Sequence, residues 1–235
     1  MLVPGTVPAA VVVLLLHGVY GCHWSWLHQG GAELVLHQLT AAGVIPPMLL
    51  VMPSDGGRGD GSAYANFGGA DHESWIVDAI PDVVSAMHEC RPLPLCIGGL
   101  SMGGFGAPGL AARHSSSFTA VAAHSSVTSL EGLQRFGHAP LDASIDDRDL
   151  PTLLFVTDGL PPLALDGGID DFLSRTTVAC TMSSRPVAWP TATMRPRAAM
   201  SGRTGSVGYP VRCDSSLIGS TLNDHRVDIT GGLDR

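Results

Sequence analysis

The most constraining feature of this sequence is the apolar run Val11–Leu16 (VVVLLL), which contains no polar residue and ends in a His-Gly pair. A strand with one face in water alternates apolar and polar residues, whereas a parallel strand covered on both faces is apolar throughout. Comparable short runs recur at residues 47–52, 93–97 and 118–123, and helix-like stretches separate them at residues 33–42, 74–89 and 105–113. This alternation predicts an α/β fold with a mostly parallel sheet and helices on both faces.

Composition and charge narrow the kind of partner that the chain can bind. Its 235 residues suit one domain, and the formal net charge is −8, with 13 Arg and no Lys. This charge argues against a nucleic-acid groove and an anionic membrane surface, so we expect a small-molecule partner. The 5 cysteines are odd in number and form no CxxC pair, which is typical of reduced thiols in a cytoplasmic protein. Cys22, His23 and His28 lack a second ligand pair, so no metal site is expected.

The strongest chemical motif is a G-x-S-x-G string, GLSMG, at residues 99–103. It follows the predicted strand 93–97 and leads into the predicted helix 105–113. A sharp strand-to-helix turn of this kind exposes a serine oxygen at the edge of the sheet. Ser101 is therefore the candidate nucleophile, and the alternative interpretation is an ordinary glycine-rich turn.

A serine nucleophile also needs hydrogen-bond donors for the negative oxygen that forms on its substrate. The backbone N–H of Met102, directly after the nucleophile, is one candidate. Residues 17–21 (HGVYG) follow the first predicted strand, and their glycines allow close backbone approach, so the N–H of Val19 is the second candidate. His17 is interpreted as a structural residue that braces this loop. The glycine-rich loop at residues 55–69 and the region of Trp24 are expected to form part of the wall of the site.

Several strings along the chain resemble one protein family in composition and order. They are LLLHG at 14–18, MPSDGGRGDGSAY at 52–64, WIVDAIPDVV at 75–84, GLSMGGFGA at 99–107, HSSVT at 124–128 and LPPLALDGGIDDFL at 160–173. The family is the esterase D-like branch of the α/β-hydrolases, which includes S-formylglutathione hydrolases, feruloyl esterases and mycolyltransferases. The resemblance implies an α/β-hydrolase fold, with its first strands trimmed here, and a serine carboxylesterase that cleaves short-chain acyl esters or thioesters without a cofactor. Acyl transfer to an acceptor other than water stays open, because both reactions share the acyl-enzyme.

The acidic member of the catalytic triad has two candidates. The resemblance implies Asp170, in the GGIDDFL segment. Periodicity alone favours Asp158, which follows the apolar run 153–156. The two choices differ in whether residues 153–156 or residues 162–165 form the next strand.

The histidine of the triad is the missing part of the pattern. The histidine motif that the family carries after its acid is absent, and His225 is the only histidine that follows Asp170. His124, at the end of the predicted strand 118–123, lies near the site, but the resemblance gives it a structural place. A hydrolase fold that has lost its catalytic base is therefore the competing hypothesis.

The charge balance changes near residue 172. Residues 1–171 hold 5 Arg and 17 acidic residues, a net charge of −12, whereas residues 172–235 hold 8 Arg and 4 acidic residues, a net charge of +4. The second part also loses its apolar periodicity. We therefore divide the chain into an esterase domain at residues 1–173 and an aberrant, irregular basic tail at residues 174–235. Reading the tail's codons from one base earlier can yield a helix followed by a GGHEW string, so the tail is interpreted as frameshifted or disordered.

Overall fold

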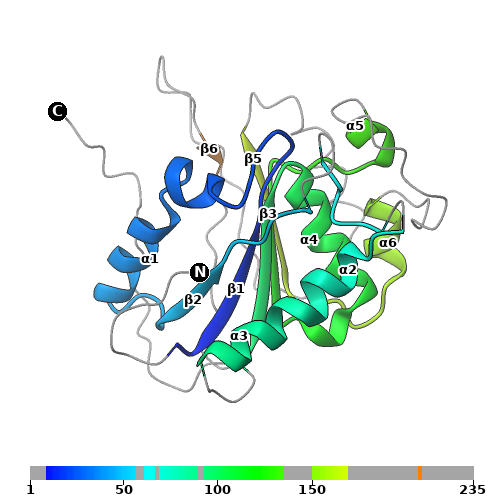
Figure 1. Ribbon diagram of the computed structural model, residues 1–235. Coiled ribbons are helices and arrows are strands. Elements are labelled where there is room, and N and C mark those ends of the chain that lie inside the picture. Colours follow the sequence, from blue (N-terminus) through cyan, green and yellow to red (C-terminus); the bar gives the residue numbers. More distant parts are fainter. Residues whose placement is uncertain are drawn as a thin grey trace, which may run out of the picture.

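The computed structural model describes residues 9–56, 61–66, 69–88, 93–134, 150–168 and 206–207. A six-stranded sheet runs through them in the order β2-β1-β3-β4-β5-β6. The first five strands are parallel, and β6 pairs antiparallel with β5. Their bounds are β1 (Val11–Leu16), β2 (Met48–Val51), β3 (Leu95–Leu100), β4 (Ala120–His124), β5 (Leu163–Gly168) and β6 (Ser206–Val207) (Figure 1).

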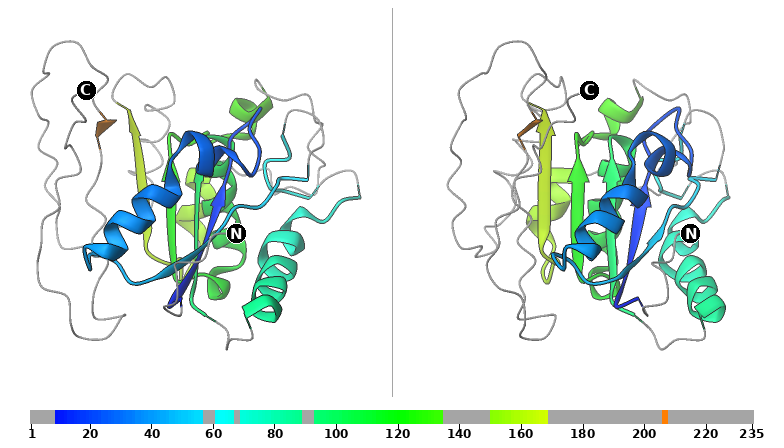
Figure 2. Two further views of the ribbon diagram at one scale, coloured as in Figure 1. Left: turned by 60° about the vertical axis from the view of Figure 1, so that its left-hand side comes forward. Right: turned by 90° about the vertical axis from the view of Figure 1, so that its left-hand side faces the viewer.

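The helices lie on both faces of the sheet, and the strand order explains why. A crossover between parallel strands is right-handed, so a chain that moves from β1 to β2 and then back across to β3 places its helices on opposite faces. Accordingly α1 lies on one face, and α3 and α4 lie on the other (Figures 1 and 2). The helical segments are η1 (Ser25–Gln29), α1 (Ala32–Ala41), α2 (His72–Ser74), η2 (Trp75–Ala79), α3 (Ile80–His88), α4 (Met102–Arg113), η3 (Ser115–Ser117), α5 (Leu130–Gln134) and α6 (Leu150–Val156).

This architecture confirms the predicted fold class, a mostly parallel sheet between helices. The interpretation that residues 153–156 form the next strand is wrong, because these residues belong to helix α6. Strand β5 begins at Leu163. Leu153 and Leu154 are buried while Phe155 and Val156 are exposed, which is the pattern of a helix resting on a core. The predicted boundary after Leu173 and the irregular tail fall mostly outside the described residues and stay predictions.

The main core lies between the sheet and the helices α3 and α4. Leu14 and Leu16 of β1 are fully buried, and so is Leu110 of α4. Every residue of α4 from its start to Ala112 is buried. This helix follows Ser101 directly, so the segment that carries the candidate nucleophile is anchored in the buried core.

Candidate active site

The sheet order itself indicates where a ligand should bind. After β1 the chain crosses to β2 on one side, and β3 lies on the other side of β1. Connections that leave in opposite directions open a crevice at the carboxyl edge of the strands, and ligands of open α/β sheets bind at such a point. The loop at residues 17–21 follows β1 and Ser101 follows β3, so both reach this crevice.

Ser101 stands between β3 and α4 in a backbone conformation that is unusual for a residue with a side chain, with φ 57° and ψ −111°. Its N–H donates to the carbonyl oxygen of His124 at 2.9 Å. The flanking glycines are sterically required, because a Cβ on Gly99 would lie 2.1 Å from the Gly103 oxygen and a Cβ on Gly103 would lie 2.3 Å from the Leu16 oxygen. The surrounding structure therefore holds Ser101 in strain, which is characteristic of functional turns.

The two candidate oxyanion donors lie on either side of Ser101. Met102 is the first residue of α4, and an N–H at this helical position has no partner within the helix. On the other side, Gly18 packs against Ser101, because a Cβ there would lie 3.3 Å from the Ser101 Cβ and 3.8 Å from its Oγ. Val19 follows Gly18 directly. Within the described residues, neither the Val19 nor the Met102 N–H donates a hydrogen bond.

Two residues of the glycine-rich loop after β2, Gly61 and Ala63, lie close to Met102, and Gly61 also lies close to Val19. A Cβ on Gly61 would lie 2.4 Å from the Met102 Sδ and 3.3 Å from a methyl carbon of Val19. The Ala63 N–H also lies 3.4 Å from the Met102 sulfur, within hydrogen-bonding distance. The described part of the loop therefore contacts the residues that carry both candidate oxyanion donors, and its role as the wall of the site stays a prediction.

His17 is buried and uses its ring to hold the loop that carries Val19. Its Nδ1 lies 2.9 Å from the Gly18 oxygen, and its Nε2 lies 3.3 Å from the Asp55 N–H, so the neutral ring with its proton on Nδ1 satisfies both partners. The main chain of His17 exchanges hydrogen bonds with the Tyr64 hydroxyl, at 2.8 Å to its N–H and 3.2 Å to its oxygen. Burial, together with the nearby Asp55 carboxylate, raises the pKa of Tyr64, which keeps this hydroxyl protonated. His17 thus has the bracing role expected of it.

A histidine and a carboxylate meet beside Ser101 on the neighbouring strands. Strand register pairs Leu100 with His124 and His124 with Asp166, so the two side chains stand next to each other at the carboxyl edge. The His124 Nδ1 contacts the Asp166 carboxylate. The hydrogen bond to Asp166 raises the pKa of His124, against the opposing effect of partial burial. The sequence analysis did not identify Asp166, whose signal is its place at the end of the apolar run that became β5.

The structure describes one of the two candidate acids, Asp158, and not the other. Asp170 and His225 lie outside the described residues. Asp158 lies in the turn between α6 and β5, before the strand begins, so it is at the amino edge of the sheet. Ser101 is at the opposite edge. The alternative that Asp158 completes the triad is therefore wrong.

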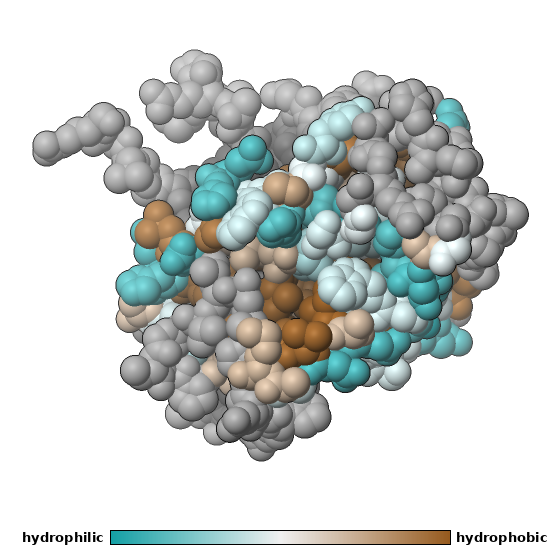
Figure 3. All heavy atoms as spheres, viewed as in Figure 1, coloured by the Kyte–Doolittle hydropathy of each residue, from teal (hydrophilic) through white to brown (hydrophobic). Residues whose placement is uncertain are grey.

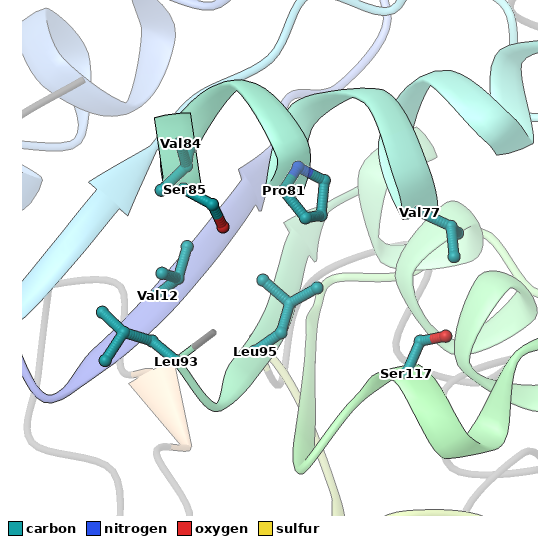
Figure 4. A pocket seen from close by; sticks show the side chains of 8 residues that line it. All are labelled: Val12, Val77, Pro81, Val84, Ser85, Leu93, Leu95 and Ser117. Carbon is teal, nitrogen blue, oxygen red and sulfur yellow. The ribbon is translucent and has the colours of Figure 1, made fainter. Parts of the chain in front are cut away.

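A cavity of about 190 Å³ also lies away from Ser101, under α3 near the start of β1 and β3. Mostly apolar side chains line it, together with Ser85 and Ser117 (Figure 4). Apolar residues also gather over this lower part of the molecule at its surface (Figure 3). Because the cavity is at the amino edge of the sheet, it does not belong to the crevice of the nucleophile.

Two further features are absent from the residues that the structure describes. These residues contain no group of three His, Cys, Asp or Glu side chains arranged to hold a metal ion. None of the helices found in these ranges has the length and apolar character that a bilayer-crossing segment needs.

The sheet order, the strained serine turn and the crevice beside it define an α/β-hydrolase fold. Residues 8–197 match the family model described as "Putative esterase", and the chain belongs to this family, which makes it an esterase-type hydrolase. Among solved structures, a ferulic acid esterase superposes with a TM-score of 0.61 at 24% identity, covering 75% of this chain and 72% of that one. The serine hydrolase FphF of Staphylococcus aureus gives 0.57 at 22% identity, with 74% and 70% covered. The S-formylglutathione hydrolase FrmB of the same organism gives 0.53 at 20%, with 74% and 70% covered. A comparison with curated proteins gives no match.

Proposed function

We propose that this chain is a serine carboxylesterase in which Ser101 attacks the carbonyl carbon of a short-chain acyl ester or thioester. The Ser101 Oγ forms a bond to that carbon while a base takes its proton, and the alcohol or thiol leaves with a proton returned by the same group. Water then attacks the acyl-enzyme and releases the acid. The N–H groups of Val19 and Met102 stabilise the oxygen that becomes negative in each step.

The observation that carries this proposal is the backbone of Ser101. A positive φ at a residue with a side chain costs about 1–3 kcal/mol and persists where the surrounding structure requires it. Here the strain presents the serine at the start of α4, whose N-terminal dipole favours developing negative charge. An ordinary glycine-rich turn would place a glycine at this position, because glycine adopts a positive φ without the steric cost.

The surroundings of Ser101 support the proposed substrate class. The glycine-rich loop and the loop after β1 form the wall of the crevice, and two aromatic side chains, Tyr20 and Trp24, are exposed beside it by 75% and 50%. A small, uncharged ester suits such a site better than a polyanion, given the net charge of −8. Similar folds are described as a ferulic acid esterase and an S-formylglutathione hydrolase, which act on an ester and a thioester. We propose the same bond types for this chain, a cytoplasmic location and no cofactor.

The resemblance implies Asp170 as the carboxylate that orients the catalytic histidine. The competing function, a hydrolase fold without catalysis, rests on the missing histidine motif. The two functions differ in the state of Ser101, because a serine without a base reacts little faster than any other hydroxyl.

The test is covalent labelling of the full chain with a fluorophosphonate, the probe class that the related FphF binds, together with hydrolysis of nitrophenyl acetate. We expect one label per chain and measurable hydrolysis, both lost in Ser101→Ala. Removing a triad serine lowers kcat on the order of a millionfold in a serine protease. Ser85→Ala, in the cavity at the other edge of the sheet, is the matched control and should keep both signals. Labelling that persists in Ser101→Ala would refute the assignment, and an unaltered chain that neither labels nor hydrolyses would support the impaired hydrolase.

A further inference from the structure

We propose that His124, oriented by Asp166, is the group that exchanges protons with Ser101. This inference rests on the proposed function and assigns its missing base. It places the base on the strand beside the nucleophile, whereas the family pattern has it after the triad acid. It also makes Asp166 the orienting carboxylate in place of Asp170.

The first argument is the position of the pair in the sheet. His124 is the register partner of Leu100, the residue before Ser101. Its carbonyl oxygen accepts the Ser101 N–H at 2.9 Å, so the two backbones are one hydrogen bond apart. The two residues therefore share the carboxyl edge of adjacent strands, and the crevice of the nucleophile opens there.

The second argument is the state of the imidazole ring. Its Nδ1 contacts the Asp166 carboxylate, which fixes the proton on Nδ1 and leaves Nε2 as the nitrogen that can accept a proton. Within the described residues no group hydrogen-bonds Nε2, and the side chain is 52% exposed. The Trp26 ring lies with its centroid 6.4 Å from that of His124, on the side of the loop that carries Val19. A carboxylate at Nδ1 and an open Nε2 are what a general base beside a serine requires.

The third argument comes from four other described histidines. His17 lies near Ser101, but both of its ring nitrogens are used in the loop. His114 lies at the opposite end of α4 and binds Glu73 at 3.0 Å. His23 and His28 lie against the ring of Trp24. Of these histidines, His124 is the one that combines a place next to Ser101 with an accepting nitrogen.

With His124 as the base and Asp166 as its partner, each proton transfer in the reaction has a donor and an acceptor. The His124 Nε2 takes the Oγ proton as the serine forms its bond to the carbonyl carbon, and the resulting imidazolium is stabilised by Asp166. It gives that proton to the departing alcohol or thiol when the tetrahedral intermediate collapses. A water molecule next loses a proton to Nε2 as it attacks the acyl group, and the proton returns to Oγ when the acid leaves.

The experiment compares four variants of the full chain by nitrophenyl acetate hydrolysis, with fluorophosphonate labelling of Ser101 as a second readout. His124→Gln is expected to lower kcat/KM by about a hundredfold to ten-thousandfold, the usual contribution of a general base. His37→Gln, at an exposed histidine of α1, is the matched control and should stay within twofold. His225→Gln and Asp170→Asn test the alternative base and the alternative acid.

Two further measurements separate proton transfer from a structural role. Imidazole added to His124→Ala should restore part of the hydrolysis, which it cannot do for a misfolded site. Asp166 is the charged partner of the ring, and Trp26 is its neutral neighbour. Asp166→Asn should therefore move the acidic limb of the kcat/KM profile to lower pH, because the carboxylate is the group that raises the pKa of His124.

Each result of these experiments either supports or overturns the assignment of His124 and Asp166. Activity within twofold in His124→Gln, or loss in His225→Gln without loss in His124→Gln, overturns it. Loss in His124→Gln without imidazole rescue and with an unmoved pH profile in Asp166→Asn also overturns it, because the pair would then be structural. A larger loss in Asp170→Asn than in Asp166→Asn overturns the acid assignment. An unaltered chain without Ser101-dependent hydrolysis refutes the proposed function itself, which distinguishes that failure from the others.

Discussion

The strain at Ser101 predicts that Ser101→Gly stabilises the protein while abolishing activity. The backbone there has φ 57° and ψ −111°, where a Cβ is unfavourable and glycine is not. Relief of this strain is worth about 1–3 kcal/mol. Glycine loses more chain entropy on folding, at about 0.5–1 kcal/mol relative to alanine. The net expectation is an increase of about 0.5–2 kcal/mol in the free energy of unfolding.

The reference for this prediction is Ser101→Ala, which removes the hydroxyl but keeps the Cβ and its strain. The Ser101 side chain makes no capping hydrogen bond to α4, so the loss of Oγ itself should have little effect on stability. Urea unfolding followed by circular dichroism gives the difference between the two variants. In a thermal scan, about 2–4 °C per kcal/mol at this chain length corresponds to a rise of about 1–8 °C. A glycine variant no more stable than the alanine variant would refute the strain argument.

Three further predictions concern the supports of the site. Gly103→Ala should destabilise the fold by about 3 kcal/mol or more, because its Cβ would lie 2.3 Å from a β1 carbonyl oxygen. Gly109→Ala in the same helix, whose Cβ would meet only a flexible side chain at 3.4 Å, should be neutral or stabilising by about 0.5–1 kcal/mol in urea unfolding. Tyr64→Phe should cost about 1–3 kcal/mol in the same assay and lower kcat, because it leaves the buried main chain of His17 unpaired. Asp166→Asn should lose stability at low pH and progressively less as pH rises through the raised pKa of its histidine partner, a trend that chemical unfolding from pH 5 to 9 would show.

The fold was accessible from the sequence because its strands are buried on both faces. Val11–Leu16 has the same bounds in the prediction and in the structure, since no polar residue interrupts the run. Residues 153–156 were ambiguous because a short apolar run suits a strand and a buried helix equally well. The structure resolves it as a helix because the consecutive residues Leu153 and Leu154 are both buried, an arrangement that depends on partners far away in the sequence.

The candidate nucleophile could be predicted for a different reason, namely that a tight turn restricts which residues can occupy it. A Cβ on Gly99 would lie 2.1 Å from a backbone oxygen and a Cβ on Gly103 would lie 2.3 Å from another, so the string GLSMG carries steric information that one sequence can show. The Val19 loop was located by the same logic, since Gly18 packs against Ser101. A steric requirement between neighbouring residues restricts which residue types can stand there, so the sequence shows it.

The sequence alone does not show the relation between Ser101, His124 and Asp166, because this relation depends on the register between strands. His124 and Asp166 are 42 positions apart in the numbering, and they meet because β4 pairs with β5 without a shift. A one-residue slip in that pairing would turn the aspartate to the other face of the sheet and separate it from the ring. The family pattern directs attention to residues after the triad acid, whereas the topology places His124, whose ring contacts Asp166, on the strand beside Ser101, with its carbonyl oxygen accepting the Ser101 N–H. Strand register is thus the physical property on which the choice of the base depends.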